Sequence, residues 1–341
     1  METGLTYREA GVDLEAAARV KARLGELVET TRTNAVAAGF GSFGGRFRAS
    51  GGPELVASAD GVGTKLKAAF LTGRHDTVGV DLVNHCVNDI LTEGAVPLVF
   101  MDYFACGVLE PETVVAVVSG LAAACRQNGC ALVGGETAEM PDFYPEGEYD
   151  LAGFIVGQLE FPGVASRDLR VGDRIIGLES NGLHTNGYSL VRRLLFDRLG
   201  LDVADEFPGT GTTVGEVLLR PHRSYLEVLR GSCEAGRIRA LAHVTGGGIP
   251  GNLGRVLPPG VSARVDTGTW TPASEFSFIA EQSGASRDEM YRTFNMGAGM
   301  LAVVSPEDET GVCEAIMEAG CPAFPCGEIV AGDGSVLLDE L

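Results

Sequence analysis

Hydrophobic and polar positions divide residues 80–97, VDLVNHCVNDILTEGAVP, into the two faces of a helix. At 3.6 residues per turn the polar stripe comprises Asp81, Asn84, His85, Asn88, Asp89 and Thr92. The apolar side comprises Leu82, Val83, Cys86, Val87, Ile90 and Leu91. The polar stripe carries no Lys or Arg, although a merely solvated face favours Glu, Lys, Arg and Gln. The pattern therefore predicts a helix whose polar face contacts something specific.

The same patterns predict alternating helices and strands along the rest of the chain. We expect a helix over 13–31 with Asp13 as its N-cap, and one over 110–129 that begins near Pro111. A third helical pattern covers 188–200. Strands are expected at 54–59, 97–106, 151–161, 174–180 and 298–304, and a short strand running into a polar turn at 130–140. This alternation predicts an α/β or α+β fold.

The chain length of 341 residues exceeds what one hydrophobic core usually organises, so two domains are expected. The segment FPGVASRDLRVGD looks like the passage between them, which gives domains of residues 1–162 and 163–341. Eight cysteines without a CxxC pair favour a reduced, cytoplasmic protein. The N-terminus lacks a signal-peptide pattern, and no apolar run reaches the roughly 18 residues of a membrane span.

The net charge of −20 argues against binding to nucleic acids or anionic membranes. An acidic protein that handles phosphate must do so locally, with metal ions, backbone N–H groups and a few placed cations. Only three lysines occur, Lys21, Lys65 and Lys67. The motif DGVGTKLKA places Lys65 beside Gly61 and Gly63, which allow close approach of an anion, and beside Asp60, which can hold Mg²⁺. The alternative is a tight turn with a solvated Asp and Lys.

The stretch GFGSFG, residues 39–44, matches the GxGxxG pattern of dinucleotide-binding folds. That pattern needs a strand before it and a helix after it, and here a helix precedes it. A surface loop, or a lid that is mobile without ligand and closes over bound ligands, is the preferred interpretation.

Metal binding by the 81–92 helix has two interpretations. His85 and Asp89 are spaced to hold zinc, but no third protein ligand is evident from the spacing. Oxygen ligands such as Asp81 and Asp89 suit Mg²⁺ better. Farther along, GGETAEM places Glu136 and Glu139 just after a predicted strand. Acidic residues there are expected equally often in a functional site and in a solvated turn.

Two glycine-rich turns in the second half, SNGLHTNGYS and VTGGGIPGN, precede helical patterns. The N–H groups at a helix start bind phosphate without added charge. From residues alone we therefore expect a two-domain enzyme that holds Mg²⁺ and a polyphosphate in the first domain and a smaller phosphate in the second.

Seven segments, taken in order, resemble the aminoimidazole ribonucleotide synthetase family of purine synthesis. They are AGVD, SADGVGTKL, DLVNHCVNDILTEGAVP, ALVGGETAEMP, GLHTNGYSLVR, HVTGGGIPGN and RTFNMGAGM, within Tyr7 to Gly327. The D-x₄-G-A-x-P signature of this ATP-binding superfamily falls on Asp89, Gly94, Ala95 and Pro97. The superfamily also includes selenophosphate synthetase and thiamine monophosphate kinase, which the chain resembles less.

The resemblance implies an ATP-dependent ligase that converts formylglycinamidine ribonucleotide into aminoimidazole ribonucleotide, ADP and phosphate. It also implies a homodimer in which the N-terminal domains pair into a shared β-barrel, with the ATP site in a cleft near the interface. An alternative is another ATP-dependent synthetase or kinase of the superfamily. A rival of another class is an NAD-binding oxidoreductase or a non-catalytic nucleotide-binding protein.

The resemblance also assigns roles to residues. ATP is expected at Asp60, Gly61, Gly63, Thr64, Lys65, Asn84, Asn88, Asp89, Gly94, Gly134, Gly135, Glu136 and Thr137, and Mg²⁺ at Asp60, Asp89 and Glu136. The catalytic candidates are Lys65, on the ATP phosphates, and His184, in proton handling or phosphate contact; the substrate phosphate is expected at Asn186, Gly246, Gly247 and Gly248. We interpret His85 as a residue that holds the ligand-binding side chains in position, or as a purely structural residue. Some family members carry a phosphate-binding lysine where this chain has Gly25. Either Lys21 or an arginine makes that phosphate contact here, or the contact is absent.

Overall fold

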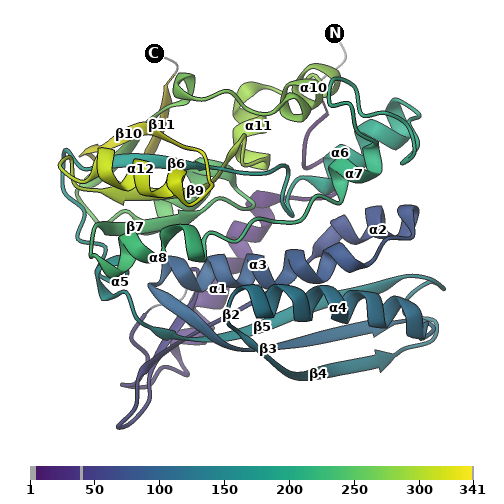
Figure 1. Ribbon diagram of the computed structural model, residues 1–341, viewed down its shortest axis with the longest axis horizontal. Coiled ribbons are helices and arrows are strands. Elements are labelled where there is room, and N and C mark those ends of the chain that lie inside the picture. The colour runs from purple at the N-terminus through teal and green to yellow at the C-terminus, as the bar shows by residue number, and fades with distance from the viewer. Residues whose placement is uncertain (1–4, 39–40, 340–341) are drawn as a thin grey trace.

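The helix expected from the stripe pattern is present as α3, Asp76–Thr92, at the centre of the molecule (Figure 1). The computed structural model describes residues 5–38 and 41–339. Every α3 residue from 81 to 92 is buried. The apolar side of α3 packs on the N-terminal sheet, and its polar side faces the C-terminal domain. Neither face of this helix is a solvated surface.

The N-terminal sheet has the strand order β1-β2-β5-β3-β4. Strands β3 and β4 are parallel and joined through helix α4, as a parallel pair requires, whereas the other neighbours are antiparallel. Helices α3 and α4 cover one face of this sheet (Figure 1). The bounds are β1 Gly45–Arg48, β2 Glu54–Gly61, β3 Ala95–Cys106, α4 Pro111–Gln127, β4 Ala131–Glu139 and β5 Tyr149–Leu159.

Two glycines set the distance between α3 and α4. A Cβ atom at Gly79 would lie 2.3 Å from the carbonyl oxygen of Val117, and one at Gly120 would lie 2.1 Å from that of Asp76. Because a close-packed interior cannot absorb such overlaps, a side chain at either position would push the helices apart. The two glycines thereby fix the position of the α3 polar stripe.

The C-terminal sheet has the order β11-β8-β10-β6-β9-β7, in which only the β8/β11 pair is parallel among the described strands. Its strands are β6 Arg174–Glu179, β7 Ile238–His243, β8 Val261–Asp266, β9 Ala298–Val304, β10 Ala323–Ala331 and β11 Val336–Asp339. The helices of this half are α6 Tyr188–Arg192, continued by a π-helical turn over Arg193–Arg198, α7 Val214–Leu218, α8 Leu226–Glu234, α9 Gly248–Leu253, α10 Ser274–Ser283, α11 Arg287–Thr293 and α12 Glu309–Glu318.

Two α/β domains are therefore confirmed. Strand β5 ends at Leu159, short helix α5 follows at Pro162–Ser166, and β6 begins at Arg174. The predicted boundary between residues 162 and 163 stays a prediction. The N-terminal sheet is open in the described chain, with β1 and β4 at its edges, so one chain forms no closed barrel.

One sequence prediction about the fold is wrong. The segment GGETAE was expected to be a polar turn after a short strand, but it belongs to β4, which pairs with β3 from Ala131 to Glu139. Two adjacent glycines are unusual inside a strand and resemble a turn. Edge pairing with β3 outweighs that local preference.

The N-terminal segment crosses to the other domain before helix α1, Leu14–Glu29. The Tyr7 N–H donates to Glu289 Oε1 at 2.7 Å, and the Leu5 N–H donates to the Ser283 carbonyl at 2.9 Å. Asp13 caps α1 as predicted, since its Oδ1 accepts from the Ala16 N–H at 2.8 Å. Among the described helices, none has the length and apolar character to cross a bilayer.

Candidate active site between the two domains

A cavity of 570 Å³ lies between the two domains, a size typical of small-molecule sites. Its walls come from the end of β2, the middle of α3, the loop before α6 and the loop before α9. The lining residues are Tyr7, Val12, Lys21, Ser42, Phe43, Ser58, Ala59, Asp60, Gly61, Val62, Gly63, Thr64, His85, Asp89, Thr185, Asn186, Tyr188, Ser189, Thr245, Gly246 and Arg255. The structure thus brings together several residues that the sequence assigned to ATP, to the metal and to the substrate phosphate.

Two of the three predicted metal ligands, Asp60 and Asp89, share this cavity with His85. The Asp60 carboxylate accepts from His85 Nε2 at 2.7 Å, and the Asp89 carboxylate lies 4.0 Å from the same nitrogen. Burial alone would raise the pKa of Asp60, but the His85 charge and hydrogen bond lower it to about 2. Burial alone would lower the pKa of His85, but Asp60 and then Asp89 raise it to about 9. At neutral pH His85 is therefore a cation between two carboxylates.

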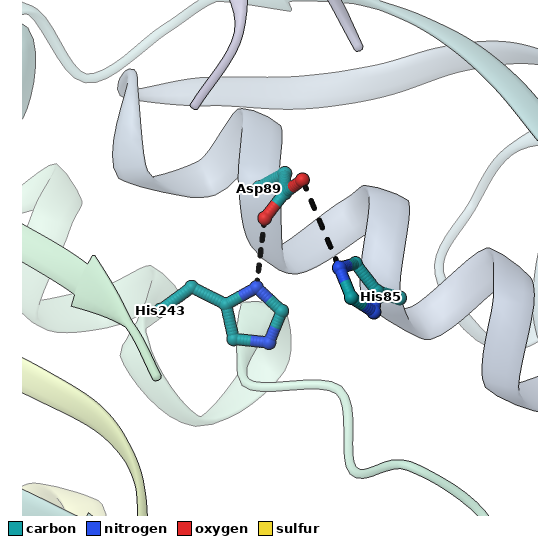
Figure 2. A group of neighbouring side chains, drawn as sticks. All are labelled: His85, Asp89 and His243. Atoms are coloured by element: carbon teal, nitrogen blue, oxygen red, sulfur yellow. Dashed lines mark hydrogen bonds and ion pairs between the residues drawn. The ribbon is translucent and has the colours of Figure 1, made fainter. Parts of the chain in front are cut away.

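A chain of hydrogen bonds leads from His85 through the C-terminal domain back to Asp89. His85 Nδ1 lies 2.9 Å from Thr185 Oγ1, which lies 3.5 Å from His222 Nδ1. His222 Nε2 lies 3.0 Å from His243 Nε2, and His243 Nδ1 donates to Asp89 Oδ1 at 2.8 Å (Figure 2). One arrangement satisfies every link: His85 donates to Thr185, Thr185 to His222, and His222 to His243. The circuit couples the two domains at the cavity wall.

The sequence analysis did not single out His222 or His243. His243 ends the apolar strand β7 and directly precedes the glycine turn VTGGG. A histidine that ends an apolar strand just before a glycine-rich turn is a sequence signal that could have been used. His222 stands in an irregular segment and offers no comparable local signal.

The polar stripe of α3 does contact something specific, but mainly the backbone of the other domain rather than a nucleotide. Asp81 Oδ1 accepts from the His222 N–H at 2.7 Å, and Asn84 Nδ2 donates to the His222 carbonyl at 2.7 Å. Asn88 donates to the Arg223 carbonyl at 2.8 Å and accepts from the Tyr225 N–H at 2.9 Å. These hydrogen bonds engage both amides in the described structure, and the predicted ATP contacts of Asn84 and Asn88 stay a prediction. A backbone loop needs both donors and acceptors, which amides supply and Lys or Arg cannot.

Lys65 is engaged inside the protein in the described structure, and its predicted phosphate contact stays a prediction. Its ammonium is fully buried and donates to Asp81 Oδ1 at 2.7 Å, to the Arg220 carbonyl at 2.8 Å and to the His184 carbonyl at 3.1 Å. These three acceptors use all three ammonium protons. Gly63 and Thr64 begin the short helical turn that aims Lys65 into the domain seam, so the backbone of this motif, and not its lysine, faces the cavity.

His184 is not among the residues that line the cavity, and its predicted role in proton handling or phosphate contact stays a prediction. It is buried, with a left-handed φ of 60°, and its ring stacks on His222 at a centroid distance of 3.9 Å. Its Nε2 lies 3.0 Å from Asn181 Oδ1. Burial, followed by the charge of His243, holds the pKa of His184 well below its usual value, so the ring is neutral. His184 shapes the seam behind the cavity wall.

The predicted contacts of Gly134, Gly135, Glu136 and Thr137 lie elsewhere. These residues are exposed on edge strand β4, and the first three line a separate hollow of 520 Å³. In β5, Gly153 packs on Leu82 of α3, so its neighbour Phe154, which lines that hollow, points to the opposite face of the sheet. Within one chain Glu136 therefore does not join Asp60 and Asp89.

Three more glycines of the predicted site have structural roles. Gly94 follows α3 with a φ of 75°, and a Cβ there would lie 2.3 Å from the Phe161 carbonyl oxygen. At Gly248 a Cβ would lie 1.7 Å from the Tyr291 carbonyl oxygen, and Gly247 has a φ of 95°. None of the three lines the cavity. Asn186 and Gly246 do line it, and Asn186 Nδ2 is buried without a hydrogen-bond partner.

Besides His85, two cationic side chains line the cavity, Lys21 from α1 and Arg255 from the C-terminal domain. Lys21 is exposed, and whether it, an arginine or no residue replaces the lysine of some family members stays a prediction. Arg255 donates to the Gly41 carbonyl at 3.2 Å and to the Ser42 carbonyl at 2.9 Å, and its guanidinium lies 3.6 Å from the Phe43 ring centroid.

The glycine loop is therefore held at the mouth of the cavity by the other domain. Its described part, residues 41–44, leads into strand β1 rather than a helix, which is not the arrangement of a dinucleotide-binding turn. Phe43 and Gly44 are buried, and the Phe43 N–H donates to Glu93 Oε1 at 3.3 Å. Gly39 and Phe40, which belong to the predicted lid, lie outside the described residues.

Comparison with known proteins decides the family. The protein-family model "AIR synthase related protein, N-terminal domain" matches residues 37–159, and the family model for the C-terminal domain matches residues 170–340. The phosphoribosylformylglycinamidine cyclo-ligase of Geobacillus kaustophilus is 46% identical over 96% of each chain. The enzyme of that name from Sorangium cellulosum is 47% identical over 98% of each chain.

This chain belongs to the phosphoribosylformylglycinamidine cyclo-ligase family. The resemblance drawn from its seven segments is confirmed, and with it the expectation of a ligase enzyme. A thiamine-monophosphate kinase structure from Stenotrophomonas maltophilia has a TM-score of 0.63 and 20% identity, and the match covers 94% of this chain and 95% of that one. At that identity the likeness shows a shared fold. It agrees with the superfamily inferred from the sequence.

Proposed function

We propose that the chain closes the imidazole ring of aminoimidazole ribonucleotide from formylglycinamidine ribonucleotide, using ATP and releasing ADP and phosphate. The observation that carries this proposal is near-full-length identity of 46–47% with enzymes named for that reaction. The acid-lined cavity between the domains supports it, since it combines metal-compatible carboxylates, glycines and the cationic side chains of Lys21 and Arg255. The reaction belongs to purine biosynthesis, as the relatives' names indicate.

The proposed chemistry activates a poor leaving group. The γ-phosphoryl group of ATP passes to the formyl oxygen of the substrate, and ADP leaves. The amidine nitrogen then attacks the formyl carbon, a C–N bond forms, the C–O bond breaks, and phosphate leaves with the loss of one proton. Such a sequence requires alignment and charge neutralisation rather than a covalent nucleophile on the protein.

Nucleotide binding is assigned to the β2 end of the cavity. The backbone of Gly61, Gly63 and Thr64 faces the cavity and offers close approach to phosphate oxygens. Lys21 and Arg255 supply positive charge on either side. Asn186 and Gly246 are assigned to the substrate phosphate, because both line the opposite wall and the Asn186 amide has a free donor.

Asp60 and Asp89 would hold Mg²⁺. Both carboxylates line the cavity, and the low pKa of Asp60, to which His85 contributes, keeps that group ionised. Carboxylate oxygens suit a hard cation that keeps several waters and shares substrate phosphates. When bound, the ion neutralises developing charge on the transferred phosphoryl group.

We also propose a homodimer in the cytoplasm. The sheet face away from α3 and α4 exposes Met101, Val133 and Phe154, which are 39%, 57% and 46% exposed, and such a patch favours a protein interface. Glu136 lies beside this face, so its predicted metal role depends on a cleft that a second copy completes. Eight free cysteines, all buried, fit a reducing compartment.

The test supplies formylglycinamidine ribonucleotide with Mg-ATP and follows ADP and the imidazole product together. We expect equal amounts of both. Absence of the imidazole from a folded, ATP-binding protein would overturn the proposal. ADP formation with a different acceptor would instead indicate another kinase or synthetase of the superfamily, and saturable NAD binding without ATP binding would indicate the oxidoreductase.

A further inference from the structure

Three potential metal ligands converge beside the cavity from two domains. His85 and Asp89 stand one turn apart on α3, and His243 ends β7 on the other side of the seam (Figure 2). One ligand atom from each lies within 4.8 Å of the others, and all three residues are buried. Sequence spacing revealed no third ligand for the His85–Asp89 pair, and the fold brings His243 to that position.

The distances are close to those of a four-coordinate ion. Bonds of about 2.0–2.2 Å to nitrogen and oxygen place tetrahedral ligands about 3.4 Å apart. His243 Nδ1 lies 2.8 Å from Asp89 Oδ1, and His85 Nε2 lies 4.0 Å from Asp89 Oδ2. Asp60 Oδ2 lies 2.7 Å from His85 Nε2 and borders the group of three. The three ligand atoms, all within 4.8 Å of one another, leave a fourth position for a water molecule.

The surroundings also match those of a metal site. A ligating histidine usually donates its second ring nitrogen to an oriented partner. The second nitrogen of His85 lies 2.9 Å from Thr185 Oγ1, and that of His243 lies 3.0 Å from His222 Nε2. If His243 coordinates through Nδ1, its Nε2–H donates to His222, whose Nδ1–H can donate to Thr185. Both ligand rings are therefore held in place by partners outside the site.

The charge at this position also favours a cation. Asp60 and Asp89 place two carboxylates around His85, and the cavity gives access, since all three residues line it. A divalent ion would replace the proton on His85 Nε2 and leave the local charge closer to balance.

We propose that His85, Asp89 and His243 bind a divalent transition-metal ion of the zinc class, with water in the fourth position. Two imidazoles and a carboxylate form a donor set that such ions prefer over Mg²⁺. The binding itself is independent of the reaction proposed above. One consequence rests on that reaction: because the ion occupies Asp89, which is also a proposed Mg²⁺ ligand, Zn²⁺ should inhibit turnover in competition with Mg²⁺.

The experiment titrates metal-free protein, without nucleotide, with Co²⁺ as a visible-absorbing substitute and then displaces it with Zn²⁺. We expect one Co²⁺ per chain with the absorption of a four-coordinate nitrogen and oxygen site. His85→Asn and His243→Asn should each weaken binding at least about tenfold, the scale on which even supporting groups of metal sites act. His75→Asn is the matched control, since His75 hydrogen-bonds Tyr149 and lies outside the cluster. It should bind as the wild type does.

Thermal unfolding gives a second measurement that does not depend on absorption. Zn²⁺ should raise the midpoint of the wild type and of His75→Asn, but not that of His85→Asn. A thiolate-to-cobalt band, no saturable binding, or equal affinity in His85→Asn would overturn the site. Turnover with Mg-ATP is measured separately. Metal binding without turnover would therefore contradict only the proposed reaction, and turnover without metal binding would contradict only this site.

Discussion

The Lys65 ammonium lies 2.7 Å from Asp81 Oδ1, and both side chains are fully buried. The lysine of the glycine motif thus joins β2, α3 and the 220–222 segment of the other domain, since it also reaches the Arg220 carbonyl. Removing one member of such a pair leaves an uncompensated buried charge, whereas an exposed pair contributes little. The structure therefore assigns Lys65 to the stability of the seam.

Lys65→Met should lower the free energy of unfolding by about 3–5 kcal/mol, the scale for breaking a buried pair. Urea denaturation measures it. Lys67→Met is the control, because Lys67 is 38% exposed and pairs with Glu148 at the surface. It should change stability by less than about 1 kcal/mol. A Lys65 variant that is as stable as the wild type but binds ATP weakly would show instead that Lys65 contacts the ATP phosphates.

Asn88→Ala should also destabilise the protein, because it leaves both the Arg223 carbonyl and the Tyr225 N–H without partners. A loss of about 2–4 kcal/mol follows from two unsatisfied buried groups. Asn88→Asp keeps the acceptor but turns a buried carboxylate oxygen toward the Arg223 carbonyl, so it should also destabilise the protein if backbone contact is the role of this residue. If instead the ATP KM rises in both variants with stability unchanged, Asn88 contacts the nucleotide.

Asp89→Asn should reduce kcat by about a hundredfold or more, equivalent to about 3 kcal/mol of transition-state stabilisation. The change keeps the size and the acceptor for His243, so unfolding should be little affected, whereas a hard cation loses a charged ligand. Activity across a Mg²⁺ titration checks this. Asp76→Asn, at the exposed start of the same helix, should leave kcat unchanged. Near-wild-type activity of Asp89→Asn at limiting Mg²⁺ would remove Asp89 from the site.

Arg255→Lys should loosen the glycine loop, because lysine cannot both lie over the Phe43 ring and donate to two carbonyl groups in one plane. Limited proteolysis of this region should become faster in the variant. In the wild type, ATP with substrate should slow it. Arg230→Lys, in a surface pair with Glu227, should behave as the wild type. If the rate of cleavage is the same with and without ligands and the same in Arg255→Lys, the loop does not act as a lid.

Stability should fall as pH rises toward 9. The pKa of His85 rises from 6.5 to about 9 on folding, so its contribution is complete below pH 6.5 and is lost as pH passes through about 9. The pKa of Asp60 is lowered to about 2, so its contribution is present above pH 3.8 and is lost toward pH 2. Urea denaturation between pH 6 and pH 10, with a chelator present, should show the alkaline loss in the wild type and in His75→Gln. Its persistence in His85→Gln would show that another group titrates.

Local patterns predicted the elements of the fold better than the partners of their side chains. The spacing of α3, the Asp13 cap and the glycine turn before β9 are local, and each is confirmed. The backbone groups that Asn84 and Asn88 contact in the other domain lie more than 130 residues away along the chain, and no local pattern reveals them. Lys65 looked like a phosphate ligand because a buried lysine paired with Asp81 carries the same sequence signature as a catalytic one. Asp60 and Asp89 reach the cavity as expected, but their histidine neighbour His243 depends on how the domains meet.

The amide stripe of α3 has a consequence for motion. Opening the domains would expose Lys65, Asp81, Asn84 and Asn88 together and break their contacts with residues 220–225 in one step. A seam of this kind resists hinge bending, so entry and exit of ligands fall to the parts held by few contacts, the glycine loop and the exposed helix α1. We therefore expect calorimetry to record a single unfolding transition for both domains, and hydrogen exchange to be slow at α3 and fast at the mouth of the cavity. Ligand entry and exit during turnover would then depend on motions at the mouth of the cavity, while the two domains stay fixed relative to each other.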